Sequence, residues 1–377
     1  MFGIPGFDEL ASGVPVVAAP DLERSLGTAH AALAVIVFLV PGAIGFVVDP
    51  WLFLLADRYP RRWFVRAGMG GMAAASFVAA IAPGPITLAL AIGAIGIASG
   101  IACSLAQATL VDRNSDARGR TLARWTLVSV VGDLATPALL AGLAFAGMGW
   151  RVAYAIVGAA LLVWFVALCV GYDDDATTEK EASPPLLSVL RDALRDRTLI
   201  AWLLGTELCH LLDEVLVVFA SLHLRIDLGA SVFWQSATIA VFMIGDALGL
   251  IGIDRLLRAR SERSLLVIAS LGCAIAYGVW LAAPTPLAAL VLAFPVGVFT
   301  APLYPLAAAQ AYATRPEQSG SVLAIGHLFT PLSLATPWLI GAVADRAGTT
   351  AALALLVAQP LGLVALVAAT ARRNEAA

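Results

Sequence analysis

A histidine and three acids lie within one apolar stretch of this sequence. Residues 198–224 are largely hydrophobic, yet they contain Glu207, His210, Asp213 and Glu214. An ionised acid at the centre of a bilayer costs about 2.5–3.5 kcal/mol even on insertion scales. These side chains must therefore face a polar cavity, pair with a base or carry a proton. Glu207, His210 and Glu214 follow a spacing of three and then four residues, which places them on one stripe of a helix.

A similar acidic pair occurs near the start of the chain. FDEL at residues 7–10 is similar to LDEV at residues 212–215, so Asp8 and Glu9 correspond to Asp213 and Glu214 of the later stretch. Carboxyl groups inside a membrane that take up and release protons can couple transport to a proton gradient. We expect these acids and their polar neighbours to carry proton coupling or substrate binding. The alternative is a structural polar contact between helices.

A further acid lies in the middle of another apolar run. Asp133 stands in VVGDLATP between Gly132 and Pro137, two residues that loosen a helical backbone. We count Asp133 among the proton-coupling or substrate-binding candidates. Because these candidates include more acids than bases, they favour a cationic or neutral substrate over an anion. Aromatic walls for such a substrate could come from Trp234, Phe242 and Tyr304.

The elements that must position these residues are membrane helices. Hydrophobic residues make up 60% of the 377 residues and charged residues only 13%, a composition that water-soluble domains do not have. About 20 apolar residues cross the hydrocarbon core, and continuous rather than alternating apolar runs exclude a β-barrel. The sequence therefore predicts an all-α membrane protein with twelve spanning helices, at residues 1–20, 28–52, 63–82, 86–110, 122–146, 152–171, 199–222, 231–253, 262–282, 286–311, 320–344 and 348–370.

The basic residues predict how these helices are oriented. Lysine and arginine total 23. With a cytoplasmic N-terminus, only Arg24, Arg151, Arg225 and Arg346 fall on the outer side, which leaves 19 for the inner loops, the linker and the C-terminal tail. By the positive-inside rule, both termini are then cytoplasmic. We find no removable signal peptide and expect a multi-pass protein of the cell membrane, which in a bacterium is the inner membrane.

The chain divides into two similar halves. Residues 172–198 turn polar and cannot cross a bilayer, and their second half has the leucine spacing of a surface helix. The segments on either side of these residues repeat each other; for example, GRTLARW at 119–125 is similar to GSVLAIG at 320–326. We predict two pseudo-symmetric six-helix bundles, residues 1–171 and 199–377, joined by a cytoplasmic linker. Two facing bundles can enclose a polar cavity and expose it to alternate sides by rocking.

The loop after the second predicted helix carries a specific motif. LADRYPRR at residues 55–62 resembles the signature of the major facilitator superfamily, in which an Asp-Arg pair and a following Arg-Arg lie between helices two and three. DRLLRAR at 254–260 is a weaker copy, and GWR at 149–151 resembles the start of helix six. The chain departs from the pattern at Phe53 and Pro60, where the family has glycine. The resemblance implies the fold of that superfamily, alternating access, and a central cavity lined by helices one, four, seven and ten.

The same loops hold a candidate conformational gate. Arginines there can bridge to acids or phosphates at the inner surface, and a helix N-terminus can stabilise an acid with its partial positive charge. The alternative is that these arginines only anchor the topology. Acids recur at one offset of 197 residues in the two halves. The predicted gate residues are Asp49, Asp57, Arg58, Arg61, Arg62, Asp246, Asp254 and Arg255.

These features favour a secondary transporter that exports a small organic cation or amphiphile in exchange for protons. The segment VVGDLATP is partly similar to the helix-five motif of proton-linked antiporters, with Thr136-Pro137 where that motif has Gly-Pro. Such exporters usually carry an arginine in helix four, and this chain has none between Arg66 and Arg113. The carboxyl groups and His210 would then switch without that arginine. We expect a monomer without a cofactor, whose partners are its substrate, protons and the lipid bilayer.

Two other functions stay open within the same fold. The acids around His210, with Cys209 adjacent, could coordinate a divalent metal or metal chelate for export, although one helix cannot supply a full coordination shell. The second is proton-coupled uptake of a small metabolite, because the loop motif also occurs in importers. We predict no resident metal site. An enzyme is disfavoured because no histidine stands in a recognised catalytic spacing, and neither a nucleotide-binding GxxxxGKS or GxxxxGKT motif nor any nucleic-acid-binding feature is present.

Overall fold

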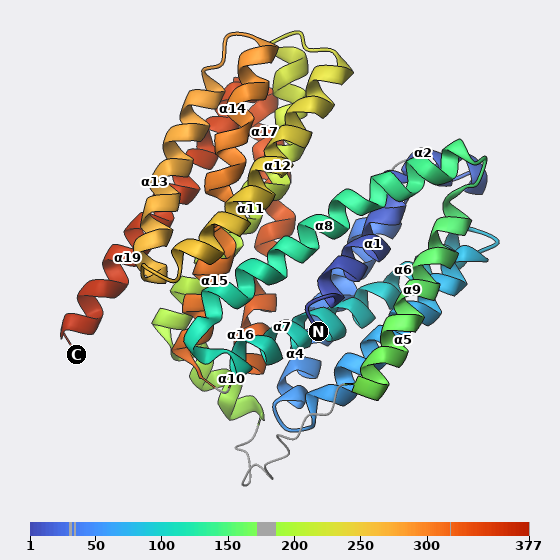
Figure 1. Cartoon of the computed structure of the whole chain (residues 1–377), viewed down its shortest axis with the longest axis horizontal. Coiled ribbons are helices and arrows are strands. Elements are labelled where there is room, and N and C mark those ends of the chain that lie inside the picture. Colours follow the sequence, from blue (N-terminus) through green and yellow to red (C-terminus); the bar gives the residue numbers. More distant parts are fainter. Residues whose placement is uncertain (30–31, 34, 172–185, 317, 377) are drawn as a thin grey trace. The chain divides into compact units, whose positions relative to one another are not determined.

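The structure is a computed structural model of the chain that describes residues 1–29, 32–33, 35–171, 186–316 and 318–376 (Figure 1). Side chains are described for these residues except 186–187, 189, 210–215, 217–218, 333–334 and 372–376. Every regular element in the described ranges is a helix. The first part of the predicted linker, residues 172–185, lies outside the described residues.

Helices occupy all six ranges predicted in the first half of the chain. In order, they are α1 (Ile4–Val17), α2 (Ala19–Leu26), η1 (Val35–Leu39), α4 (Val40–Ala56), α5 (Arg61–Ala80), α6 (Pro85–Ser99), η2 (Gly100–Ser104), α7 (Leu105–Arg113), η3 (Ser115–Ala117), α8 (Arg118–Phe145) and α9 (Trp150–Gly171). The predicted boundaries differ from these by only a few residues at most ends.

The second half follows the same pattern. Its helices are α10 (Leu186–Arg195), α11 (Arg197–Ile226), α12 (Val232–Leu256), α13 (Glu262–Leu281), α14 (Pro286–Thr300), α15 (Leu303–Thr314), α16 (Ser319–Gly326), η4 (His327–Phe329), α17 (Thr330–Ala347), α18 (Thr349–Ala354), η5 (Leu355–Val357) and α19 (Ala358–Ala376). The short helix α10 corresponds to the predicted surface helix. Asp196 then starts α11, because its Oδ1 atom accepts the backbone N–H groups of Thr198 and Leu199 at 3.0 and 3.1 Å.

Within the described ranges, nine helical stretches are long and apolar enough to cross a membrane. The other three predicted spans contain α1, α5 and α11. α1 has only 14 residues, α5 begins with two arginines, and α11 carries several acids along its 30 residues. These are the helices that hold most of the predicted chemistry, and they differ from the other nine by the short length of α1 and by the charged residues of α5 and α11.

Several spans are interrupted rather than straight. The second begins with the π-helical turn η1, the fourth contains the π-helical turn η2 between α6 and α7, and the eleventh contains the 3₁₀ turn η4 between α16 and α17. Such interruptions free backbone groups and often mark functional positions. Here η2 contains Cys103 and η4 contains His327, and both residues face acids that are described below.

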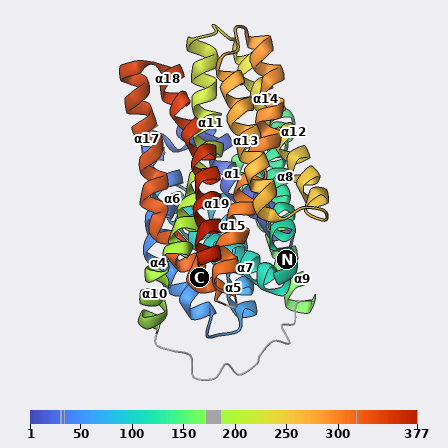
Figure 2. The ribbon, with the colours of Figure 1, turned by 90° about the vertical axis from the view of Figure 1, so that its left-hand side faces the viewer.

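The described helices pack into two compact units. Unit 1 consists of residues 1–113, 128–193 and 317–328, and unit 2 of residues 114–127, 194–316 and 329–377. In unit 1, α5 packs between α6 and α9. In unit 2, α14 packs against both α12 and α13 (Figure 1), and α17 and α18 lie side by side (Figure 2). Each unit thus includes a short segment from the opposite half of the sequence.

Candidate functional site

Three acids from two helices of unit 1 come together. Glu9 of α1 is hydrogen-bonded to Asp133 and Ser129 of α8, and Asp8 is close enough to interact with both carboxyl groups electrostatically. We call Asp8, Glu9 and Asp133 the acid cluster. The sequence indicated all three residues, but it grouped Asp8 and Glu9 with their repeat counterparts Asp213 and Glu214 and treated Asp133 by itself.

Glycine packing positions Glu9 against Asp133. A Cβ atom added at Gly132 would lie 2.5 Å from the carbonyl oxygen of Gly6 and 2.8 Å from Cβ of Glu9. One turn further along α8, the hydroxyl group of Thr136 donates to the carbonyl oxygen of Glu9 at 3.3 Å. A larger residue at position 132 would have to push α1 and α8 apart. The close approach therefore depends on Gly132.

Asp8 contacts a different pair of elements. Its carboxyl group is hydrogen-bonded to Ser99 at the end of α6 and to Cys103 in η2. Its Oδ1 atom is buried with no hydrogen-bond partner among the side chains and backbone that the structure describes. Sequence analysis did not identify Ser99 or Cys103, because small polar residues are common in packed helices and neither stands in a motif.

The acid cluster has the chemistry of a proton or cation site. Two carboxyl groups in hydrogen-bond contact share a proton, since two adjacent carboxylates would repel each other. Among the described residues, the groups that interact with the Glu9 side chain are Asp133, Asp8, Ser129 and Cys103, and none of these is a base. Such a cluster can bind a proton or a cation and can release one when it takes up the other.

The second predicted acidic group belongs to α11 in unit 2. Glu207 is half-buried there and interacts with other groups of the protein. The backbone of α11 continues through His210, Asp213 and Glu214, but their side chains lie outside the described residues. The role of these three residues stays a prediction. Among the described residues, no group of three or more His, Cys, Asp or Glu side chains, the acid cluster included, is arranged so that it could hold a metal ion.

Asp57, the aspartate of the predicted gate motif, caps α16 within unit 1. Its Oδ1 and Oδ2 atoms accept the backbone N–H groups of Gly320 and Ser321 at 3.1 and 3.0 Å. These are the unsatisfied amides of a helix start, where partial positive charge stabilises a carboxylate. A Cβ atom at Gly320 would lie 2.5 Å from both Asp57 Oδ1 and the carbonyl oxygen of Phe53. Position 320 therefore requires glycine.

Arg61 extends the same network. Its guanidinium group binds Asp57 Oδ1 at 2.8 Å, Asp112 Oδ2 at 2.7 Å and the hydroxyl group of Ser319 at 2.8 Å. Ser319 in turn donates to Asp112 at 2.6 Å. Sequence analysis predicted Asp57 and Arg61 and missed Asp112 and Ser319. The sequence feature closest to Asp112 and Ser319 was the repeat between residues 119–125 and 320–326, which contains neither of them.

The remaining arginines of the first motif also have neighbours. Arg58 and Arg62 both interact with other groups of the protein, and the Arg62 guanidinium lies 5.8 Å from the ring centre of Trp63. Both arginines therefore take part in the packing around this loop.

The copy of the motif in unit 2 is arranged differently. Asp254 binds Arg124 through both carboxylate oxygens, at 2.8 and 3.2 Å, and lies 3.9 Å from Arg258. The helix start that corresponds to α16 is that of α8, and here the amide of Gly119 donates to Glu262 rather than to Asp254, at 2.7 Å. Arg255 is exposed.

The two predicted bracing acids are both buried. Asp49 of α4 has its Oδ2 atom 3.7 Å from Nδ1 of His327 in η4. A Cβ atom at Gly100 would lie 2.7 Å from that same oxygen, so Asp49 packs against the start of η2. In unit 2, Asp246 of α12 lies where α12 meets α14 at Gly297.

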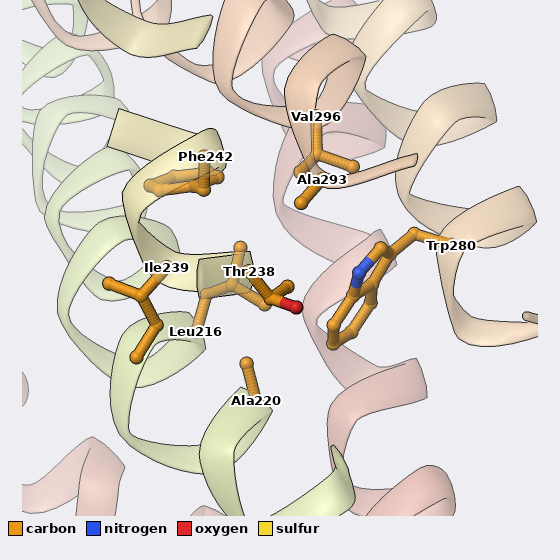
Figure 3. A pocket seen from close by; sticks show the side chains of 8 residues that line it. All are labelled: Leu216, Ala220, Thr238, Ile239, Phe242, Trp280, Ala293 and Val296. Atoms are coloured by element: carbon orange, nitrogen blue, oxygen red, sulfur yellow. The ribbon is translucent and has the colours of Figure 1, made fainter. Parts of the chain in front are cut away.

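Unit 2 contains an apolar cavity between α11, α12, α13 and α14 (Figure 3). About 300 Å³ there, including space open to solvent, is not filled by protein atoms. Its walls are Leu216, Ala220, Thr238, Ile239, Phe242, Trp280, Ala293 and Val296. The hydroxyl group of Thr238 already donates to the carbonyl oxygen of Trp234, and the indole N–H of Trp280 to that of Ala289. The cavity therefore offers apolar and aromatic contacts, and Phe242 lies in its wall.

A hydrogen-bonded cluster that the sequence did not indicate closes one end of unit 2. Asp227, directly after α11, binds His223 at 2.6 Å and Thr350 at 2.9 Å, and it also binds Thr349. Burial raises the pKa of Asp227, but the hydrogen bonds from Thr349, His223 and Thr350 outweigh burial and hold that pKa below its ordinary value. The cluster ties the end of α11 to the start of α18.

Comparison with solved structures defines the class of this fold. A variant of the E. coli fucose:proton symporter FucP superposes with a TM-score of 0.80 at 12% identity, covering 97% of this chain and 96% of that one. The human organic anion transporter MFSD10 gives 0.74 at 17% identity, with 97% of each chain covered. The proton:xylose symporter XylE gives 0.74 at 12% identity, covering 96% and 93%. The fold is that of a twelve-helix membrane transporter built from two six-helix bundles.

The sequence itself places the chain in a family. The profile of the Major Facilitator Superfamily matches residues 6–212, more than half of the chain. No curated protein sequence matches it at a significant level. The chain therefore belongs to the major facilitator superfamily, and it is a transporter rather than an enzyme. The predicted fold class and family are confirmed.

Proposed function

We propose that this transporter exports a small organic cation or amphiphile in exchange for protons. Membership of the superfamily makes it a secondary active transporter of the membrane. The observation that carries the finer proposal is the contact between Glu9 and Asp133, with Asp8 beside it. A carboxyl pair with no base among its described neighbours holds a proton until a cation replaces it, and that competition is the basis of antiport.

The apolar cavity of unit 2 supports the amphiphilic part of the proposal. Its walls take up hydrocarbon or aromatic surface, and the polar groups of Thr238 and Trp280 are already satisfied. A sugar would instead need several convergent hydrogen-bonding groups. FucP and XylE are proton symporters for sugars, so uptake of a small metabolite is the second candidate, supported by fold similarity alone.

The test is proton flux in liposomes that contain the purified protein and an internal pH dye. A panel of lipophilic organic cations, divalent metals and sugars is added to wild type, Glu9→Gln and Asp133→Asn. We expect an organic cation to evoke proton movement in wild type and not in Glu9→Gln. Exchange of labelled for unlabelled cation, which needs no net proton movement, should survive in that variant.

Two results would contradict the proposal. Proton movement evoked by a sugar and not by any cation would favour uptake, and movement evoked by a metal alone would favour metal export. Asp21→Asn serves as a control, since Asp21 is an exposed acid of α2 that pairs with Arg24. It should transport like wild type. The cytoplasmic position of both termini, the inner-membrane location and the monomeric state are part of the same proposal.

A further inference from the structure

A polar basin opens at one end of unit 2, where the chain enters α8 and where it passes from α12 to α13. It holds about 800 Å³ that no protein atom fills, including space open to solvent. Its charged and polar lining consists of Asp116, Arg120, Arg258, Arg260, Ser261 and Glu262. The predicted topology places this end at the cytoplasmic surface of the membrane.

One of the two acids in the wall of the basin, Glu262, is already bound through both carboxylate oxygens. Glu262 Oε1 accepts the backbone N–H of Gly119 at 2.7 Å, and its Oε2 atom accepts the side-chain amide of Gln310 at 2.7 Å. Gln310 in turn accepts from Nε of Arg263 at 2.8 Å. Glu262 therefore serves as a structural cap of α8, and its charge is stabilised by that helix start.

The arginines of the basin are not bound in this way. Within the described part of the chain, the side chains of Arg120 and Arg260 make no hydrogen bond or ion pair. Arg258 reaches Asp254 at 3.9 Å, but Asp254 already binds Arg124 through both oxygens. Three guanidinium groups thus line a concave surface that contains two acids, and one of these, Glu262, is already hydrogen-bonded within the protein.

Guanidinium groups in such a setting suit one kind of ligand. A guanidinium group donates two parallel N–H bonds that match the oxygen spacing of a phosphate, and arginine is the usual residue for this recognition. Phosphate groups are concentrated at the membrane surface in the headgroups of phospholipids, and basic pockets between helices at the inner surface bind anionic headgroups.

We propose that this basin binds a phosphate-bearing anion through Arg120 and Arg260, with Arg258 at its rim. Its position at the membrane surface favours the headgroup of an anionic phospholipid over a soluble phosphate compound. The site is independent of the proposed substrate and of the acid cluster. Because Arg120 belongs to the first turn of α8, an occupied basin stabilises the start of the helix that also carries Asp133.

The test measures binding of short-chain lipids to the purified full-length protein in detergent. The probes are dihexanoyl phosphatidylglycerol, dihexanoyl phosphatidylcholine and glycerol phosphate, and the variants are Arg120→Gln/Arg260→Gln and Arg120→Lys/Arg260→Lys. We expect phosphatidylglycerol to bind at least about tenfold more weakly to the glutamine variant, because glutamine keeps neither the charge nor the paired N–H groups of the two guanidinium groups. The lysine variant keeps the positive charge but loses the two parallel N–H donors of each guanidinium group, so its affinity for phosphatidylglycerol should lie between those of wild type and the glutamine variant.

The matched control is Arg118→Gln/Arg191→Gln, which removes the same charge from arginines outside the basin. It should bind phosphatidylglycerol like wild type. Equal affinity in wild type and the folded Arg120→Gln/Arg260→Gln variant, with folding checked by gel filtration and circular dichroism, overturns the proposal, as does an equal loss in the control. Glycerol phosphate binding as tightly as phosphatidylglycerol would support the phosphate site and assign its source to a soluble compound.

Discussion

Replacing Asp57 by asparagine tests whether this carboxylate holds residues 318–328 on unit 1. Asp57 accepts two backbone N–H groups of α16 and one N–H of Arg61. Asparagine has the same size but only one oxygen, so one buried amide loses its acceptor, at a cost of about 1–3 kcal/mol. Arg61 also loses a charged partner, worth about 1.5–3 kcal/mol, although it keeps Asp112. We expect a total of about 3 kcal/mol.

Hydrogen exchange read by mass spectrometry measures this change locally. A loss of about 3 kcal/mol increases the opening of the segment about 150-fold, so the amides of residues 318–328 should exchange faster by that factor in Asp57→Asn. Asp116→Asn, which changes an exposed acid of another loop, should leave the segment unchanged. An unaltered exchange rate in Asp57→Asn would refute the capping role, and acceleration over the whole chain would indicate general destabilisation instead.

Three further predictions concern packing, pH and substrate size. Gly132→Ala should lower stability by about 1–3 kcal/mol and reduce transport, because its Cβ atom would lie 2.5 Å from the carbonyl oxygen of Gly6, whereas Gly142→Ala meets nothing within 4 Å and should be neutral in the same unfolding and flux assays. Burial raises the pKa of Asp227 less than its hydrogen bonds lower it, so the stabilisation is complete above the ordinary value of about 3.9 and is lost as the pH falls through the lower folded value. The unfolding midpoint of wild type should therefore drop more between pH 5 and pH 3 than that of Asp227→Asn, and parallel curves would contradict this. Ala220→Leu should fill part of the apolar cavity and therefore weaken the binding of bulky cations more than that of small ones, relative to wild type. If the substitution changed the affinities for bulky and small cations by the same factor, the cavity would take no part in binding.

The two helix starts that pass to the opposite unit are both capped by carboxylates. α16 is held by Asp57, and α8 is held by Glu262. The repeat in the sequence includes the glycine at each helix start, Gly119 and Gly320, but not the acid that binds it. In unit 2 the aspartate of the motif copy pairs with Arg124 instead. In unit 2, where the motif is weaker, the helix start is therefore capped by Glu262 instead of the motif aspartate, but in both units a carboxylate binds the N-terminus of the helix.

The sequence by itself determined that the protein lies in a membrane, how many times it crosses the bilayer and which family it belongs to. Apolar runs of about 20 residues can only be helices in a bilayer, since every backbone polar group must be satisfied within its own segment. That constraint is local, so the positions of the spans agree with the structure to within a few residues at most ends. The LADRYPRR motif is also local, and it identified Asp57 and Arg61 as gate residues, although only the structure shows that these two side chains bind each other.

Only the tertiary structure decided which polar groups meet. Glu9 and Asp133 are far apart in the sequence, and their contact depends on Gly132 allowing α1 to approach α8. The partners of Arg61 and Glu262 likewise come from distant segments, residues 112, 119, 310 and 319. Helical periodicity tells which residues share a face of one helix, but it carries no information on which two faces pack together. That choice depends on side-chain volume and close packing over the whole unit.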